Sequence, residues 1–205
     1  MTKKPDSQFL GPQQRLDAWA RLGKDHFDVV VVGGGVVGAG IALDAATRGL
    51  RVALVEARDL ASGTSSRSSK MFHGGLRYLE QLEFGLVREA LAERELSMST
   101  LAPHLVKPLR FLYPLTHRVW ERPYVASGLL LYDTMGGAKS VPGQRHLSRH
   151  GALRLAPGLR RDSMIGGISY YDTVVDDARH TMTVARTAAH YGAVIRTSTQ
   201  VVGFL

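Results

Sequence analysis

The fold is decided by residues 27–58, which read FDVVVVGGGVVGAGIALDAATRGLRVALVEAR. The β-branched run at 27–32 is typical of a strand that is buried on both faces of a parallel sheet. A glycine-rich turn follows, and then a helix whose small apolar residues share one face and which ends at Gly49. Residues 51–56 predict a second strand. The stretch therefore predicts a βαβ unit and an α/β fold.

The glycine-rich turn carries a dinucleotide-binding fingerprint. Gly33, Gly35 and Gly38 have the spacing GxGxxG between a strand and a helix, and Glu56 ends the next strand. Gly33 permits a tight turn, Gly35 lets a pyrophosphate approach the helix N-terminus, and Gly38 lets the helix pack on the sheet. We expect Gly34 in the same phosphate-binding turn and Glu56 on the ribose hydroxyls, which disfavours NADP. The alternative is a glycine-rich turn without a ligand.

The segment after the second strand separates FAD from NAD. Residues 61–70 read ASGTSSRSSK and are dense in donors that suit a pyrophosphate or a flavin ring. A simple nicotinamide domain does not need such a loop, so we favour FAD. Arg58 is interpreted as a surface arginine. The candidate cofactor ligands in the loop are Thr64, Ser65, Ser66, Ser69 and Lys70.

Length and composition describe a globular chain. The 205 residues suffice for one domain, or one and part of another, at roughly 100–200 residues per domain. Apolar residues make up 44% and the mean hydropathy is −0.06, which excludes a disordered tail and a membrane bundle. There is no cysteine, so thiolate metal sites and a catalytic thiol are excluded and redox chemistry needs a bound cofactor. The histidine spacing suggests no metal site.

The net charge of +8 is concentrated in residues 103–161. An anionic-lipid face, a field that attracts a phosphorylated substrate, and ordinary solvated surface are the three interpretations. Nucleic acid is not expected as a partner, because no reading helix, aromatic platform or zinc spacing is present. Against Glu121 and Asp133, the segment holds ten basic residues: Lys107, Arg110, Arg118, Arg122, Lys139, Arg145, Arg149, Arg154, Arg160 and Arg161.

We expect three regions along the chain. An N-terminal extension, 1–26, contains a helix over 12–22. The FAD-binding domain comprises 27–102 and 162–205. A basic inserted segment, 103–161, is broken into short pieces by prolines and begins a substrate- or membrane-facing domain. Within the FAD-binding domain the sequence predicts helices over 84–101 and 176–191, a strand over 193–196, and a strand over 199–202 in which Val201 borders the adenine.

Two blocks carry a resemblance to a known family. SSKMFHGGLRYLE at 68–80 and YYDTVVDDAR at 170–179, together with the glycine motif, resemble the N-terminal part of FAD-dependent, membrane-associated glycerol-3-phosphate dehydrogenases. The resemblance implies a Rossmann-like FAD-binding fold of the glutathione-reductase or D-amino-acid-oxidase type, with part of an α+β substrate domain. It also implies oxidation of sn-glycerol 3-phosphate to dihydroxyacetone phosphate, with hydride transfer to FAD and electrons passed to a membrane quinone.

The resemblance has consequences for the state of the protein. It implies a cytoplasmic protein, peripheral on the inner face of the cell membrane, that forms a homodimer in its full-length form. Family members are well over twice as long as this chain. We therefore expect an N-terminal portion that lacks the return strands of the FAD domain, binds FAD weakly or not at all, and is inactive alone.

The same resemblance assigns the substrate side of the site. Arg77 matches the arginine that contacts the substrate phosphate, a role that suits a guanidinium fork; the alternative is an ion pair with Glu80 or Glu83. Tyr78 flanks the substrate or packs in the core. His73 is the candidate base because imidazole titrates near neutral pH, although a histidine between glycines and apolar residues is also a structural choice.

Two other functions stay open. A glycerophosphate oxidase, or another FAD-dependent amine or hydroxy-acid oxidase, would pass its electrons to oxygen. A non-catalytic nucleotide-binding fragment would act as a scaffold. The arginine in the HGGLRY block favours a phosphorylated substrate over an amino acid.

Overall fold

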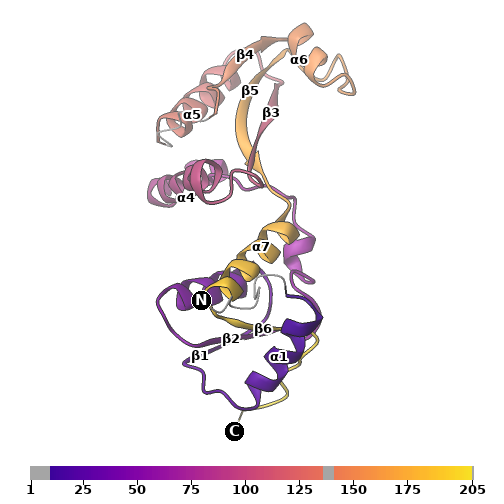
Figure 1. The fold of residues 1–205 in the computed structure, drawn as a ribbon. Helices are drawn as coiled ribbons and strands as arrows, with labels where there is room; N and C mark the ends of the chain where they lie inside the picture. The colour runs from indigo at the N-terminus through magenta and orange to yellow at the C-terminus, as the bar shows by residue number, and fades with distance from the viewer. Residues whose placement is uncertain (1–9, 136–140, 205) are drawn as a thin grey trace. The chain divides into compact units, whose positions relative to one another are not determined.

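The computed structural model describes residues 10–135 and 141–204. Lys139 of the basic segment lies outside them. The chain divides into two compact units. Figure 1 shows the elements of both, coloured by residue number from the N-terminus to the C-terminus. The first unit comprises Met1–Ser69 and Asp176–Leu205, and the second comprises Lys70–Val175.

The first unit contains a three-stranded parallel sheet with the order β1-β2-β6. Its core lies between this sheet and two helices, α2 and α7, which pack together through buried alanines. Small side chains let the two helices approach closely while both cover the sheet. The expected strands and helices of the unit are confirmed, except for the strand over 199–202. Their bounds are α1 Pro12–Leu22, β1 Val29–Val32, α2 Val36–Thr47, β2 Val52–Val55, η2 Thr64–Ser66, α7 Asp177–His190 and β6 Val194–Arg196.

The ends of these helices follow from local sequence. Gly49 and Gly192, with φ of +84° and +103°, adopt the left-handed conformation just past α2 and α7. Asp176 caps α7, because its side chain accepts a hydrogen bond from the backbone N–H of Arg179.

The first strand differs from its prediction. Val30 and Val32 are each 57% exposed, so β1 is not buried on both faces. Within residues 10–135 and 141–204, β1 pairs only with β2 and lies at the edge of the sheet, whereas β2, which is central, is buried throughout. The β-branched run therefore indicated the strand correctly but not the burial of its second face.

The helix of the N-terminal extension packs on the first unit. Arg15 donates a 2.7 Å hydrogen bond from Nη1 to Thr197 Oγ1, and Arg196 Nη1 donates to the carbonyl oxygen of Arg15 at 2.8 Å. The Arg196 guanidinium also lies 5.3 Å from the centre of the Trp19 ring. Residues 12–22 thus fold with the end of β6.

The expected strand over 199–202 does not form. Ser198 has a φ of +52°, which turns the chain just after β6. The backbone N–H groups of Ser198 and Thr199 donate to the carbonyl oxygens of Arg58 and Glu56, at the carboxyl end of β2. The segment therefore begins beside β2, and Val201 is half-buried in an irregular stretch.

The second unit contains an antiparallel sheet with the order β3-β5-β4. Pro108 and Pro114 lie within β3, where the sequence predicted that prolines break the chain into short pieces. β3 is an edge strand, so proline is tolerated there. The predicted helix over 84–101 forms as α4, and its last turn is π-helical. The bounds are α3 Leu76–Leu79, α4 Phe84–Leu96, η3 Ser97–Leu101, β3 Lys107–Leu115, α5 Glu121–Met135, β4 Arg145–Ser148, α6 Arg149–Leu155 and β5 Gly166–Val174.

The boundaries of the two units differ from the expected domains, which divided the chain at 102/103 and 161/162. The structure divides it at 69/70 and 175/176 because β5 pairs with both β3 and β4, and Met71 bridges Val174. Met71 and β5, which lie before and after the basic segment, therefore belong to the same unit as β3 and β4, which lie within it.

Candidate cofactor and substrate sites

Two glycines are required by the turn that leads into α2. Gly33 has a φ of +110°, which strains any residue with a side chain. A Cβ atom on Gly38 would lie 2.0 Å from the carbonyl oxygen of Gly33. The fingerprint spacing is therefore explained at these positions by the turn and by the packing of the first helical turn against it.

The other two glycines of the turn have different surroundings. A Cβ on Gly34 would lie 2.8 Å from Leu60 Cδ2, so its small size is needed for packing. A Cβ on Gly35 would meet only Ser65 Oγ, at an ordinary 3.5 Å. Gly35 is the N-cap of α2 and supplies no side-chain cap. Protein contacts do not require glycine there, and the open backbone fits the approach of a phosphate to the helix N-terminus.

Glu56 lies beside this turn, directly after β2. Its Oε2 accepts a hydrogen bond from the Gly34 N–H and its Oε1 accepts one from the Arg58 N–H, both at 2.7 Å. These two bonds lower the pKa of Glu56, so the side chain is a carboxylate. Each oxygen keeps a further lone pair for a ribose hydroxyl, and the charge repels a 2′-phosphate. The glycine turn and Glu56 together fit the adenosine diphosphate half of FAD.

The hydroxyl-rich loop reaches the same turn through Ser65. Its Oγ accepts a 3.0 Å hydrogen bond from the backbone N–H of Val36, the first residue of α2. Thr64 and Ser66 share the short 3-10 helix with Ser65, whereas Ser69 is exposed. Lys70 begins the second unit. The structure thus brings Ser65 to the glycine turn, and the cofactor roles of the other loop residues and of Val201 stay predictions.

The candidate substrate residues lie in the second unit, around α3. Gly75 is the N-cap of α3 with a φ of +78°, and its backbone N–H donates a 3.1 Å hydrogen bond to His73 Nδ1. An Nδ1 that accepts carries no proton, so the neutral ring has its proton on Nε2. In this geometry His73 donates from Nε2. A role as base at Nδ1 first requires the Gly75 bond to break.

Arg77 is exposed and available to an anion. Among residues 10–135 and 141–204 it has no hydrogen-bond or ion-pair partner, so neither Glu80 nor Glu83 holds it. The ring of Tyr78 lies against Gly75, where a Cβ would be 2.7 Å from Tyr78 Cδ2. Tyr78 therefore packs on its own loop while its side chain stays partly exposed.

The sequence did not predict a buried polar cluster behind this loop, which we call the Arg94–Tyr132–Asp172 cluster. Arg94 Nη1 lies 3.0 Å from Asp172 Oδ1, and the Tyr132 hydroxyl donates to Asp172 Oδ2 at 3.0 Å. Burial and the Asp172 carboxylate raise the pKa of Tyr132, so its hydroxyl keeps its proton. One signal was available in the sequence: Arg94 is three residues after Leu91 and shares the apolar face of α4.

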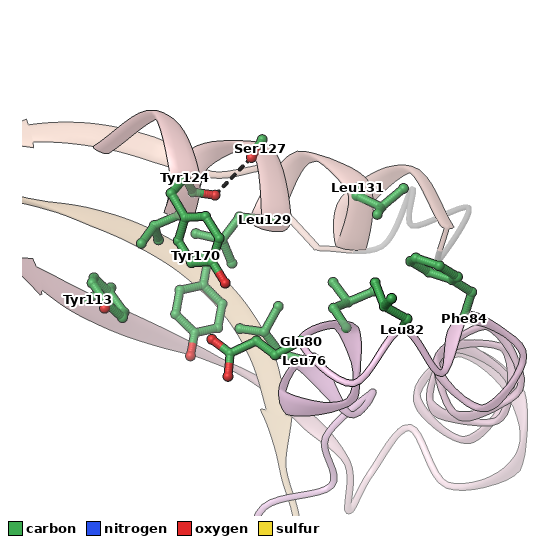
Figure 2. A pocket seen from close by; sticks show the side chains of 13 residues that line it. Leu76, Glu80, Leu82, Phe84, Tyr113, Tyr124, Ser127, Leu129, Leu131 and Tyr170 are labelled. Carbon is green, nitrogen blue, oxygen red and sulfur yellow. Dashed lines mark hydrogen bonds between the residues drawn. The ribbon is translucent and has the colours of Figure 1, made fainter. Parts of the chain in front are cut away.

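An apolar groove of about 410 Å³ lies beside α3 in the second unit. Figure 2 shows Leu82 and Phe84 on one side of it, Leu129 and Leu131 of α5 on the other, and Glu80 as its acidic group. Arg77 does not line it. The groove therefore offers apolar surface rather than a phosphate site.

The described residues contain no helix that is long and apolar enough to cross a membrane.

A family model described as FAD dependent oxidoreductase matches residues 28–205. The chain is 81% identical over 196 residues to the glycerol-3-phosphate dehydrogenase of Mycobacterium leprae (strain TN), which covers 96% of this chain and 34% of that protein. The mitochondrial glycerol-3-phosphate dehydrogenase of Homo sapiens is 44% identical over 187 residues, with 88% and 25% covered. The chain thus spans about a third of the length of the mycobacterial relative, and less of the human one.

Solved structures agree with these relatives. The glycerol-3-phosphate dehydrogenase from Bacillus halodurans complexed with FAD superposes with a TM-score of 0.65 at 31% identity, covering 94% of this chain and 30% of that one. Glycine oxidase from Geobacillus kaustophilus superposes with a TM-score of 0.62 at 28% identity, covering 85% and 47%. The resemblance, the Rossmann-like fold class and FAD as the cofactor are confirmed. The chain belongs to the family of FAD-dependent oxidoreductases.

Proposed function

We propose that the chain is the FAD-binding, N-terminal part of an enzyme that oxidises sn-glycerol 3-phosphate to dihydroxyacetone phosphate. The substrate assignment rests on Arg77 of α3, an exposed guanidinium without a protein partner among the described residues and four positions after His73 in the sequence. A guanidinium binds two phosphate oxygens at once and keeps its charge at any working pH. The glycerol-3-phosphate dehydrogenase relatives support the same substrate.

Separate residues of the chain bind the cofactor and the substrate. The glycine turn and Glu56 hold the adenosine diphosphate half of FAD, and Ser65 shapes the N-terminus of α2 beside it. When bound, FAD would supply the oxidising chemistry, by taking up the hydride from C2 of the substrate. Arg77 fixes the phosphate and so orients the rest of the substrate. His73 donates a hydrogen bond to a substrate oxygen from Nε2, and serves as base only when its Nδ1 is released from Gly75.

The function is tested by anaerobic reduction of the flavin in the protein extended to the full length of its relatives. Glycerol 3-phosphate should bleach the visible flavin absorbance, and glycerol, which lacks the phosphate, should not. Arg77→Gln should raise the substrate concentration for half-reduction at least about 100-fold, since a charge-assisted bidentate contact is lost. Arg88→Gln, which alters an exposed arginine on α4, is the matched control. Bleaching by glycine but not by glycerol 3-phosphate would refute the proposal.

The same experiment decides the electron acceptor. We propose a membrane quinone, so the bleached flavin should recover its colour with a soluble quinone much faster than with oxygen. Rapid recovery with oxygen alone would instead indicate an oxidase.

A membrane quinone implies a membrane surface, and one turn of the second unit supports an anionic lipid partner. Val119 and Trp120 are 83% and 57% exposed, next to the exposed Arg118. The nearby Glu121 is turned inward and accepts hydrogen bonds from two backbone N–H groups of the preceding turn, at 2.5 and 2.6 Å. The outward face is therefore aromatic and cationic, a combination that suits a lipid interface. We propose a cytoplasmic, peripheral protein that is a homodimer at full length.

Vesicle sedimentation tests the lipid partner. Arg118→Glu should weaken binding to vesicles that contain phosphatidylglycerol about tenfold or more, because each cation near an anionic surface contributes roughly 1 kcal/mol. Lys24→Glu makes the same charge change in the first unit and should have little effect. Equal losses in the two variants would indicate a response to net charge alone and would contradict a role for this turn.

A further inference from the structure

The Arg94–Tyr132–Asp172 cluster joins three elements of the second unit around one carboxylate. Arg94 comes from α4, Tyr132 from α5 and Asp172 from β5, and each is only 1–2% exposed. Asp172 Oδ1 accepts from Arg94 Nη1 at 3.0 Å, while Oδ2 accepts from the Tyr132 hydroxyl at 3.0 Å. A buried ion pair contributes little net stability over apolar residues of the same volume, because desolvation offsets its attraction. The cluster therefore calls for an explanation other than stability.

The same carboxylate holds the loop that carries His73. Asp172 Oδ1 also accepts from the backbone N–H of Gly74 at 3.4 Å. On the other side of His73, the Phe72 N–H donates to the Thr173 carbonyl oxygen at 3.0 Å. His73 thus lies between two backbone anchors on β5, one of which is the cluster.

Glycine is needed at position 74 because the loop backbone lies so close to the cluster there. A Cβ there would lie 2.2 Å from Leu91 Cδ2 and 2.5 Å from the Tyr132 hydroxyl oxygen. The loop backbone is therefore pressed directly onto the cluster and onto the apolar face of α4. A shift of Tyr132 or Asp172 would be passed to Gly74 without an intervening side chain.

Gly75, the residue after Gly74, contacts the imidazole of His73 directly. The Gly75 N–H donates to His73 Nδ1 at 3.1 Å, and Gly75 holds its position with a φ of +78°. The Gly74 N–H and the Gly75 N–H belong to consecutive peptide units that are joined at the Gly74 Cα. Because that Cα packs closely against Leu91 and Tyr132, the anchor on Gly74 restricts where the Gly75 N–H can lie.

We propose that Arg94, Tyr132 and Asp172 are positioning residues for His73. By holding the Gly74–Gly75 backbone, they keep the Gly75 N–H on Nδ1 of His73, so that Nε2 carries the ring proton and donates a hydrogen bond outward. The role of that donor rests on the proposed function, because it assigns His73 to the substrate. The chain of contacts from the cluster to the imidazole does not rest on it.

The contact chain is tested in this chain by NMR, without cofactor or substrate. Wild type should show a scalar coupling across the hydrogen bond between the Gly75 nitrogen and His73 Nδ1, with a His73→Gln variant to assign the ring. Tyr132→Phe and Asp172→Asn should abolish the coupling and speed hydrogen exchange of the Gly75 amide about tenfold, because the bond then opens more often. Tyr171→Phe is the matched control: it lies on the same strand but its hydroxyl bonds Arg110.

Each outcome has a consequence for the proposal. Loss of the coupling in the cluster variants, with exchange in Tyr171→Phe within twofold of wild type, supports it. Absence of the coupling in wild type, or its persistence in both cluster variants, overturns it. If Asp172→Asn does not fold, Tyr132→Phe decides. Unfolding of both would mean that the cluster holds the core of the unit rather than the loop, which also overturns the proposal.

At full length the same variants separate this inference from the proposed function. Tyr132→Phe should change kcat about tenfold and leave the KM for glycerol 3-phosphate within about twofold, because the His73 ring is no longer held by Gly75 while Arg77 still binds the phosphate. A failure of glycerol 3-phosphate to reduce the flavin would refute the proposed function but would leave the NMR result in place.

Discussion

Gly38 and Gly40 lie in the same helix, and the structure predicts opposite effects for the same substitution. A Cβ on Gly38 would be 2.0 Å from the Gly33 carbonyl oxygen, whereas a Cβ on Gly40 has open space within 4 Å. The first distance is about 1.3 Å shorter than a close carbon–oxygen contact of about 3.3 Å. The obstacle is backbone in a tight turn, which yields less readily than a flexible side chain.

The magnitudes follow from this difference. Overpacking costs about 1–3 kcal/mol, and Gly38→Ala should be at the upper end. Gly40→Ala should gain roughly 0.5–1 kcal/mol, because alanine loses less conformational entropy in a helix. At about 2–8 °C per kcal/mol, the melting temperature should fall by at least about 6 °C for Gly38→Ala and rise by a few degrees for Gly40→Ala.

Thermal unfolding followed by circular dichroism, without FAD, measures both variants. A Gly38→Ala variant that melts with wild type would refute the assignment of this glycine to helix–turn packing. Equal destabilisation by both substitutions would show that the loss of any glycine in α2 has the same effect, which the structure does not predict.

Two further substitutions test the neighbourhood of the turn. Glu56→Gln should reduce the loss of stability on acidification below about pH 5: the folded-state pKa of Glu56 is below its usual 4.5, so its contribution is complete above the unfolded-state pKa and is lost as the pH falls through the folded-state value. Melting temperatures across that pH range check this, and parallel curves for the two proteins would contradict it. Ser65→Ala should cost about 1 kcal/mol, as for the loss of a helix N-cap, because the Val36 N–H loses its acceptor. Urea unfolding measures the loss, and an unchanged midpoint would count against the contact.

The sequence predicted the parts of the fold that depend on local pattern. The β-branched run, the glycine spacing and Gly49 together predicted β1, α2 and β2, because each signal acts within a few residues. Burial of the second face of β1 depends on its place in the sheet, which residues 27–32 do not encode. The two prolines of β3 are compatible with a strand only because that strand is at an edge.

The candidate site divides in the same way. Glu56 and the glycines were predictable because motif and ligand chemistry coincide in one βαβ unit. Asp172 and Tyr132 are 40 positions apart and meet Arg94 only through the packing of α4, α5 and β5. A single sequence does not show such a meeting, although a charge on the apolar face of α4 was a sign of it.

The central claim is that this turn binds the phosphates of FAD. The most direct test of it is the effect of Gly35→Ser on FAD binding. Gly35→Ser places a favoured N-cap residue at the start of α2, and its Cβ meets only Ser65 Oγ at 3.5 Å, so stability should be preserved. The side chain would occupy the space left for the phosphates. Titration of FAD into the apoprotein extended to the full length of its relatives, followed by quenching of flavin fluorescence, should show binding by wild type and at least about tenfold weaker binding by Gly35→Ser. Equal affinities, or no binding by wild type, would contradict the account.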